Sequence, residues 1–297
     1  MTSEEVVIIG NSFSGLGTAI ACAKHGYQVT VIAPNNHSSF IGGLQIAPNG
    51  LAALSSLGVE QEILNKAVRL LAVHIKAFDT SISLTNIPLS SNNAPYVSIA
   101  RQDLYEILLN ECLTNSLINF MDAKVLAITS KNNHTRLALD TGEIITAPII
   151  IGADGWDGKT RHFISPSARQ KNSGYSIYRG IFPASKVPAG FSYPDVQLWL
   201  GSSCHLVSYP IQNSQAVNFV FAFSERAFKS HSIDAIFCNH PVLSMLGDYI
   251  QNWHLTPIKQ FDSLSNWRRG GITLIGDAAH PMPPHLAQGA GQSFMDV

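Results

Sequence analysis

The residues best suited to bind a ligand lie in one short segment near the C-terminal end of the chain. Asp277 follows the apolar run Ile272-Thr273-Leu274-Ile275, which is predicted to form a buried parallel strand. Its carboxylate therefore lies just past the carboxyl end of a strand, where ligands bind in open α/β sheets. Further along, Gly289-Ala290-Gly291 can open a helix whose free N–H groups and positive dipole end favour an anion. This pairing suits a flavin nucleotide, with its polyhydroxyl chain and a ring that becomes anionic on reduction.

Two side chains on one predicted strand could move a proton. His205 and Tyr209 are four residues apart, so both point to the same face of a strand. A histidine or a tyrosine can take up or give a proton as a general base or acid. The alternative is that the two side chains only pack within their sheet.

A nucleotide-binding pattern also lies at the start of the chain. The strand predicted at 6–9 leads into Gly10-Asn11-Ser12-Phe13-Ser14-Gly15, a helix predicted from Leu16 to His25, and a second strand at 27–32. This β-α-β unit carries a G-x-S-x-x-G turn, a variant of the dinucleotide fingerprint. Such a turn lets a pyrophosphate approach backbone N–H groups at the helix start.

Two departures from that fingerprint are expected to weaken binding. Ser12 replaces the second glycine, where its side chain could crowd the phosphates or donate a hydrogen bond to them. Ala33, followed by Pro34, stands where an acidic residue usually holds the adenosine ribose. Since a hydrogen bond to a charged group contributes about 1.5–3 kcal/mol, binding tens of times weaker is expected.

Three further motifs lie between the two ends. The first is the glycine-rich stretch 42–49, which precedes a helix predicted at about 50–57. The second is Arg101-Gln102-Asp103-Leu104, at the start of a helix predicted at about 103–115. The third is Gly152-Ala153-Asp154-Gly155, which is followed by Arg161. Each alone also fits a loop, a solvated arginine or a simple turn. In this order and near this spacing, the five motifs together resemble those of the FAD-dependent aromatic hydroxylases, the class of p-hydroxybenzoate and salicylate hydroxylases.

The resemblance implies an α/β fold, with a Rossmann-like FAD-binding domain built on a parallel sheet and an inserted, mostly antiparallel substrate-binding sheet. It implies that FAD is reduced by NADH or NADPH and reacts with O2, and that a flavin hydroperoxide then hydroxylates a small aromatic acid or phenol. The residues it assigns to FAD binding are Gly10, Ser12, Gly15, Gly43, Arg101, Asp154, Gly155, Gly276, Asp277, Gly289, Ala290 and Gly291. The catalytic or substrate-contacting candidates are His205, Tyr209, Pro284 and His285.

The middle of the chain is expected to supply the substrate-binding sheet. Short aromatic or alternating runs at 175–182, 196–200, 205–209 and 217–223 predict antiparallel strands, and a helix is predicted from Phe237 to Trp253. Two discontinuous domains follow from this. Their predicted ranges are 1–71, 96–172 and 268–297 for FAD binding, and 72–95 and 173–267 for substrate binding.

Composition limits the function classes. The 297 residues are 45% hydrophobic and 13% charged with a net charge of -1, so nothing electrostatic indicates nucleic acid or an anionic membrane. No apolar run reaches the length of a membrane span, and no signal peptide is recognised. The four cysteines and eleven histidines form no metal-binding pattern, so no metal is expected. A cytoplasmic protein, with a homodimer as one arrangement, is the expectation.

Two alternatives stay open at this point. One is hydroxylation of a quinone precursor or another large apolar ring on the same fold. The other is a degenerate or truncated flavoprotein that binds FAD weakly and does not hydroxylate, suggested by Ser12, Ala33 and the end of the chain at Val297. In the family, the helix that begins near Gly291 continues, and further structure follows it.

Overall fold

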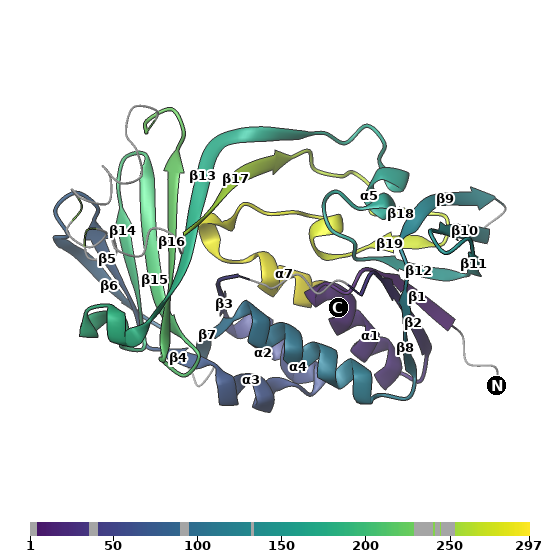
Figure 1. The fold of residues 1–297 in the computed structure, drawn as a ribbon, viewed down its shortest axis with the longest axis horizontal. Helices are drawn as coiled ribbons and strands as arrows, with labels where there is room; N and C mark the ends of the chain where they lie inside the picture. The colour runs from purple at the N-terminus through teal and green to yellow at the C-terminus, as the bar shows by residue number, and fades with distance from the viewer. Residues whose placement is uncertain are drawn as a thin grey trace.

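The computed structural model describes residues 5–35, 41–89, 95–131, 134–228, 240, 244 and 253–297. A six-stranded sheet and a seven-stranded sheet lie at opposite ends of an elongated molecule, with most of the helices beneath and between them (Figure 1). The expected α/β fold, with a parallel sheet and a second, mostly antiparallel sheet, is confirmed.

The six-stranded sheet has the order β18-β19-β12-β1-β2-β8. Its strands are β1 (Glu5–Ile9), β2 (Gln28–Ala33), β8 (Ile118–Asp122), β12 (Ile149–Gly152), β18 (Arg268–Arg269) and β19 (Ile272–Leu274). All are parallel except β18, which pairs antiparallel with β19. The chain leaves β1 toward β2 on one side and returns to β12 on the other. The order therefore reverses at β1, and this is where a ligand crevice forms in such sheets.

The helices are α1 (Phe13–Lys24), α2 (Pro48–Leu57), α3 (Glu60–Lys66), α4 (Arg101–Thr114), α5 (Lys159–Ile164) and α7 (Gly289–Asp296). Apolar side chains of α1, α2, α4 and α7 share one core with β1 and β2. The opposite face of the sheet is covered by a three-stranded sheet, β9 (Val125–Lys131), β10 (His134–Leu139) and β11 (Ile144–Ala147). Helix α1 begins earlier than predicted because Ser12 caps it, and α2 begins at Pro48, whose fixed φ suits a first helical turn.

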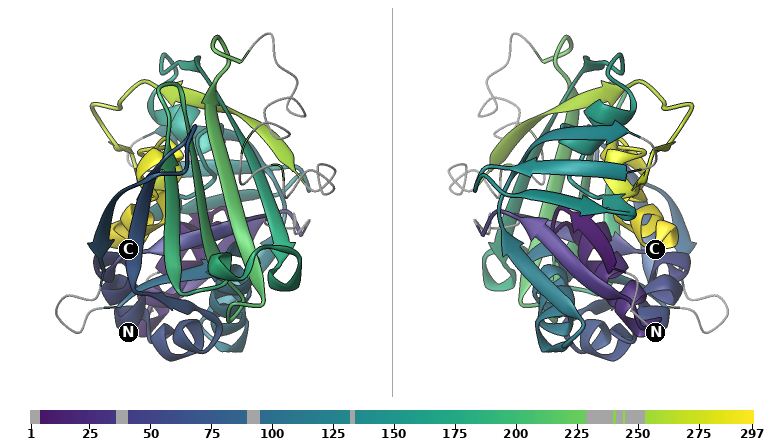
Figure 2. Two further views of the ribbon diagram at one scale, coloured as in Figure 1. Left: turned by 90° about the vertical axis from the view of Figure 1, so that its left-hand side faces the viewer. Right: turned by 90° about the vertical axis from the view of Figure 1, so that its right-hand side faces the viewer.

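The seven-stranded sheet has the order β17-β13-β16-β15-β14-β5-β6 and is seen face-on in Figure 2. Its strands are β5 (Ala72–Ala77), β6 (Ser83–Pro88), β13 (Gln170–Pro183), β14 (Asp195–Leu200), β15 (Cys204–Ile211), β16 (Ala216–Ser224) and β17 (His254–Phe261). The four strands predicted from the aromatic runs are confirmed, and the 72–95 region does add strands to the sheet. Only β14 and β5 pair in parallel.

The two sheets are linked by a small sheet and by irregular segments. The small sheet has the order β3-β7-β4, formed by Gly43–Ile46, Tyr96–Ala100 and Val68–Leu70, and the 3-10 turns include η4 (Gly276–Ala278) and η5 (Pro284–Leu286). The helix predicted from Phe237 to Trp253 lies outside the described residues except for His240, Ser244 and Trp253. The domain boundaries stay a prediction. Within the described part of the chain, no helix is long and apolar enough to cross a membrane.

Candidate functional site

A cavity of about 560 Å³ runs along the carboxyl ends of all five parallel strands. Its lining residues include 9–13 after β1, Ala33 and Pro34 after β2, 123–125 after β8, 153–155 after β12, and Asp277 after β19. Arg101, at the start of α4, also lines it. Four of the five motifs therefore meet at one cavity, whose size is typical of a ligand site.

The fingerprint turn needs its first glycine for close packing. Gly10 has a φ of +103°, and a Cβ there would lie 2.5 Å from the carbonyl oxygen of Ala153. A Cβ on Gly15 would overlap the carbonyl oxygen of Gly10. The turn is thus wedged between the end of β12 and the first turn of α1, with the N-terminal end of α1 at the cavity. Such a cradle fits the pyrophosphate of a dinucleotide.

Replacing Gly10 with alanine is expected to destabilise the protein by about 2–5 kcal/mol, since backbone strain at positive φ adds to overpacking. Gly142→Ala is the matched control, because Gly142 also has a positive φ (+88°) but nothing within 4 Å of its added Cβ. Denaturant unfolding of both variants separates the two causes. Equal losses in the two variants would contradict the close approach between Gly10 and Ala153.

The hydroxyl of Ser12 makes its hydrogen bonds to protein groups. Its Oγ donates to the carbonyl oxygen of Ala153 at 2.9 Å and accepts the N–H of Gly15 at 3.3 Å, which makes it the N-cap of α1. The hydroxyl hydrogen is therefore committed to Ala153, and the serine ties the fingerprint turn to β12.

Asp154, in the motif at 152–155, also stabilises the fold. Both carboxylate oxygens of Asp154 accept hydrogen bonds from Thr160, one from its N–H and one from its hydroxyl, so Asp154 holds the first turn of α5 while lining the cavity. Burial raises the pKa of Asp154, and these hydrogen bonds oppose the rise.

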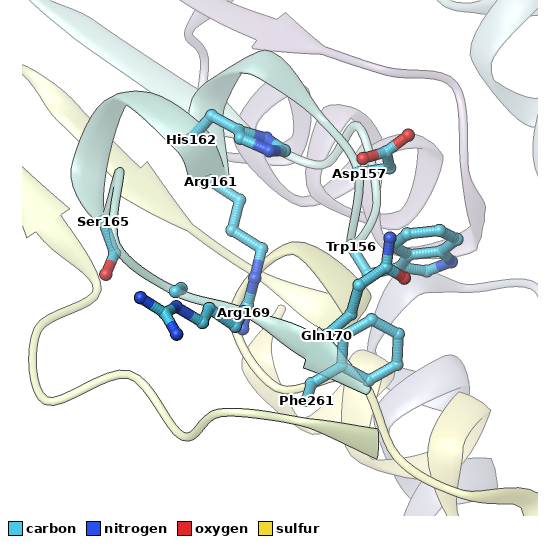
Figure 3. Close-up of a pocket in the computed structure, with 9 residues that line it drawn as sticks. Trp156, Asp157, Arg161, His162, Ser165, Arg169, Gln170 and Phe261 are labelled. Atoms are coloured by element: carbon cyan, nitrogen blue, oxygen red, sulfur yellow. The ribbon is translucent and has the colours of Figure 1, made fainter. Parts of the chain in front are cut away.

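Arg161 is buried and donates to the carbonyl oxygens of Ala278 (2.8 Å), Ala279 (3.1 Å) and Asp262 (3.0 Å). Figure 3 shows it beside Trp156 and Phe261 in a second, much smaller hollow of about 40 Å³. That hollow is too small for an aromatic substrate or a nucleotide. Arg161 thus braces the segment that carries Asp277.

Asp277 presents its carboxylate to the large cavity. The residue is exposed there although its neighbours Gly276, Ala278 and Ala279 are buried. Surrounding protein atoms raise the pKa of Asp277, while the charges of Arg101 and His280 oppose that rise. An acceptor that stays open to the cavity matches the role predicted for Asp277 with a polyhydroxyl chain.

The catalytic candidates from two distant segments come together on the seven-stranded sheet. The centroids of the His205 and His285 rings are 5.5 Å apart with an angle of 67° between the ring planes, and Tyr175 packs edge-on against His285 at 6.2 Å. Pro284 and His285 belong to η5, the turn after Asp277. Burial and the neighbouring His285 lower the pKa of His205.

Tyr209 shares the face of β15 with His205 but lies about 13 Å further along the strand, at 3.3 Å per residue. It is buried, and a Cβ on Gly43 would lie 2.8 Å from its ring. Burial raises the pKa of Tyr209, and the positive charges of Arg101 and Arg179 oppose that rise. The tyrosine therefore marks a point where the small sheet, α4 and the large sheet meet.

Sequence reasoning missed two polar residues at that point. Arg179 lies on β13, and Asn218, paired directly with Tyr209 on β16, uses its Oδ1 to accept the N–H of Gly43 at 2.8 Å. The Nδ2 of Asn218 is buried and has no hydrogen-bond partner among the described residues. Burial and the charge of Arg101 lower the pKa of Arg179. The one sequence signal for this cluster was the presence of an arginine, Arg179, inside the aromatic run of β13.

The glycines after Asp277 form the predicted helix but do not line the cavity. Helix α7 starts at Gly289 with no side-chain cap, and Gly291 lies close to α2, since a Cβ on Gly50 would be 3.1 Å from its Cα. Their role in binding an anion, like that of Ala290, stays a prediction.

Introducing glutamate at Ala33 is expected to tighten FAD binding about tenfold or more, by supplying a charged acceptor at the end of β2. The neighbouring Asp122 is already engaged, because its Oδ1 accepts the N–H of Asn35 at 2.8 Å. Fluorescence titration with FAD measures the change, and Ala33→Gln controls for size. Failure of glutamate to outperform glutamine would mean that another group already holds the ribose.

A crevice at the reversal point of a parallel sheet, with a fingerprint turn at one side and an open carboxylate at another, defines a dinucleotide-binding α/β protein. The chain belongs to the FAD binding domain family, whose model matches residues 3–297. The family resemblance drawn from the five motifs and the expected cofactor, FAD, are thereby confirmed.

Individual relatives agree with this assignment. The chain is 27% identical to 3-hydroxybenzoate 6-hydroxylase 1 of Aquipseudomonas alcaligenes, covering 98% of this chain and 78% of the relative. It is 29% identical to 3-amino-4-hydroxybenzoate 2-monooxygenase PtmB3 of Streptomyces platensis, with 98% and 77% covered. In fold it is similar to Klebsiella pneumoniae HpxO solved with FAD and uric acid, with a TM-score of 0.84, 17% identity, and 99% and 77% covered.

Proposed function

We propose that this chain is an FAD-dependent monooxygenase that uses NADH or NADPH and O2 to hydroxylate a small aromatic acid. Bound FAD supplies the activation of O2 and the delivery of one oxygen atom. The residues suited to hold it are the Gly10 turn, Arg101 and Asp277, which line one cavity. Overall, one atom of O2 is inserted into a C–H bond of the ring, and the other is reduced to water by the hydride of NADH or NADPH and one proton, which leaves NAD⁺ or NADP⁺.

The observation that favours an acidic substrate is a pair of arginines without an ion-pair partner. Arg101 and Arg179 repel each other, and neither has a carboxylate oxygen within 4.0 Å among the described residues. Keeping two guanidinium groups together away from bulk water is costly unless an anion joins them. Because Arg101 also lines the FAD cavity, a carboxylate on the substrate ring would be the anion that joins Arg179, and Asn218 has an unused Nδ2 donor in the same cluster.

The rest of that sheet face suits an aromatic ring. Val207 lies between His205 and Tyr209 on the same face of β15, and Ala222 and Ile177 lie beside His205 on β16 and β13, so this part of the face is apolar. Because burial and His285 lower the pKa of His205, the neutral ring is favoured, and a neutral ring can accept a phenolic proton. We assign this role to His205 with His285 as its neighbour, and a substrate-contacting role to Pro284 and Tyr209.

The names of both relatives also favour hydroxybenzoate-type acids over large neutral rings. The test is turnover by the purified chain with FAD, O2 and either nicotinamide cofactor. Hydroxylated aromatic acids should stimulate nicotinamide oxidation and yield a product with one added oxygen. Stimulation by neutral phenols or quinone precursors alone would reject the acid. If the protein binds FAD but forms no hydroxylated product from any aromatic compound, the alternative of an inactive flavoprotein would be favoured.

We also propose a cytoplasmic location and a homodimer. The described cysteines, Cys22, Cys112 and Cys204, are free, which suits a reducing compartment. The edge strand β6 is exposed along its whole length and offers a surface for pairing.

A further inference from the structure

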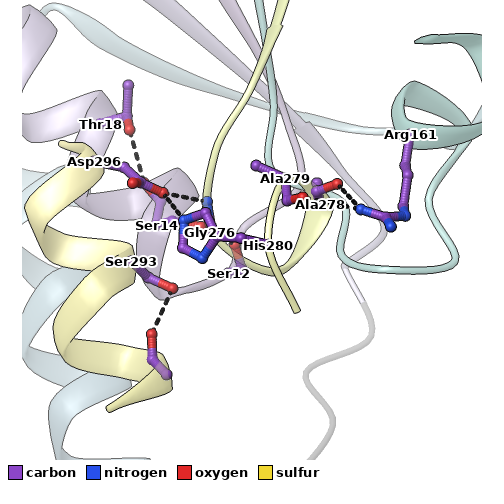
Figure 4. Close-up of polar contacts among 11 residues, drawn as sticks. Ser12, Ser14, Thr18, Arg161, Gly276, Ala278, Ala279, His280, Ser293 and Asp296 are labelled. Carbon is purple, nitrogen blue, oxygen red and sulfur yellow. Dashed lines mark hydrogen bonds and ion pairs between the residues drawn. The ribbon is translucent and has the colours of Figure 1, made fainter. Parts of the chain in front are cut away.

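Asp277 is held in place through its neighbours. On its C-terminal side, Arg161 binds the carbonyl oxygens of Ala278 and Ala279. On its N-terminal side, the N–H of Gly276 donates to Oδ2 of Asp296 at 2.7 Å. Figure 4 shows the two anchors on either side of the turn. The backbone that presents Asp277 is therefore fixed from two directions.

Asp296 makes a second contact with the same oxygen. Its Oδ2 lies 2.6 Å from Nε2 of His280, so one carboxylate at the end of α7 binds both the first residue of the turn and the histidine that follows it. The turn packs closely on both helices, since a Cβ added to Gly276 would lie 2.5 Å from Oγ of Ser14 and 3.2 Å from Oγ of Ser293. Helices α1 and α7 thus enclose the turn, and Asp296 locks it.

We propose that Asp296 is a positioning residue for the cofactor: through Gly276 and His280 it keeps the Asp277 carboxylate directed into the cavity. This rests on FAD as the occupant of that cavity. None of the five sequence motifs includes Asp296, which lies nineteen residues after Asp277 and acts on FAD only through the turn.

The contact between His280 and Asp296 depends on pH. The hydrogen bond that the His280 ring donates to Asp296 raises the pKa of His280, and burial opposes the rise. The charged groups that face His280 are Asp296 on α7 and Asp277 in the turn, while the ring of Trp267 packs 5.1 Å away. Since the folded pKa is raised, the stabilisation is complete below the ordinary histidine value and is lost as the pH rises through the raised pKa. FAD affinity should therefore fall on going from about pH 6 to about pH 9.

The experiment is FAD titration of the full chain over that pH range. Asp296→Asn is expected to weaken FAD binding about tenfold near pH 6 and to flatten the pH dependence, because the charge-assisted contact is lost. The matched control is Asp195→Asn, which breaks another His–Asp pair, with His74 at 3.1 Å on the seven-stranded sheet. This control should keep wild-type affinity and pH dependence.

His280→Gln provides a second variant in case Asp296→Asn does not fold. It leaves the Gly276 contact of Asp296 in place, so it should bind FAD with the affinity that the wild type shows near pH 9, independent of pH. Wild-type affinity and pH dependence in either variant would overturn the positioning role. Loss of thermal stability in both variants with an unchanged pH profile would also overturn it, leaving a purely structural contact. Wild-type protein that takes up no FAD would instead reject the cofactor itself.

Discussion

Asp277→Ala is expected to weaken FAD binding by about ten- to hundredfold while leaving the protein folded. The carboxylate faces the cavity, and no described group donates a hydrogen bond to it, so its loss removes contacts to a ligand rather than to the protein. Charge-assisted hydrogen bonds to hydroxyl groups are among the stronger polar contacts. Flavin fluorescence during titration gives the affinity, and thermal melting of the protein without FAD gives the stability.

Asp277→Asn is the control for this prediction. It keeps the shape and one acceptor oxygen but removes the charge, so its loss should be smaller than that of the alanine variant. Unchanged flavin content in the alanine variant would reject Asp277 as a cofactor ligand. A large drop in thermal stability without FAD would assign the residue to the fold instead.

The second large effect concerns Arg179. Arg179→Gln should lower kcat/KM for a hydroxylated aromatic acid by about ten- to hundredfold, because a partly buried guanidinium that binds the carboxylate is lost. The same variant should turn over the matching carboxamide as well as the wild type does, since the carboxamide carries no charge. Steady-state kinetics with the acid and its carboxamide gives the comparison.

Arg69→Gln is the control for Arg179, because Arg69 is an exposed arginine on β4. This variant should leave kcat/KM unchanged for both the acid and the carboxamide. Equal losses of acid and carboxamide in Arg179→Gln would show that Arg179 supports the sheet rather than reading the substrate charge. Weaker FAD binding in the same variant would place Arg179 on the cofactor side.

The parallel sheet and the cavity could be predicted from the sequence because they depend on local patterns. Continuous apolar runs gave β1 and β19, and the residue that follows each strand had to lie at one edge of the sheet. Gly10, Ala33, Asp154 and Asp277 are therefore found where the motifs placed them.

The partners of these residues could not be predicted, because each depends on contacts distant in the chain. Arg161 reaches Ala278 across 117 residues, and the hydroxyl of Ser12 reaches Ala153 across 141. The sequence identified Ser12 as a ligand-binding candidate and noted Arg161 only as the arginine that follows the Asp154 motif. In the fold their polar atoms bind backbone carbonyl groups, which carry no sequence signature.

The set of residues that share a face of the seven-stranded sheet with Tyr209 also could not be predicted from the sequence. Arg179 and Asn218 come from strands whose register decides which side chains meet Tyr209, and a shift by one residue would turn each of them to the other face. The parallel pairing of β14 with β5 has the same origin, since it joins segments more than a hundred residues apart.

Titration of the purified, folded chain with FAD tests the central claim most directly. We predict saturable uptake of one FAD per chain, with a flavin spectrum that changes again when a hydroxylated aromatic acid is added and that needs a higher concentration of the carboxamide to change. A folded chain that remains colourless after excess FAD is removed would contradict it.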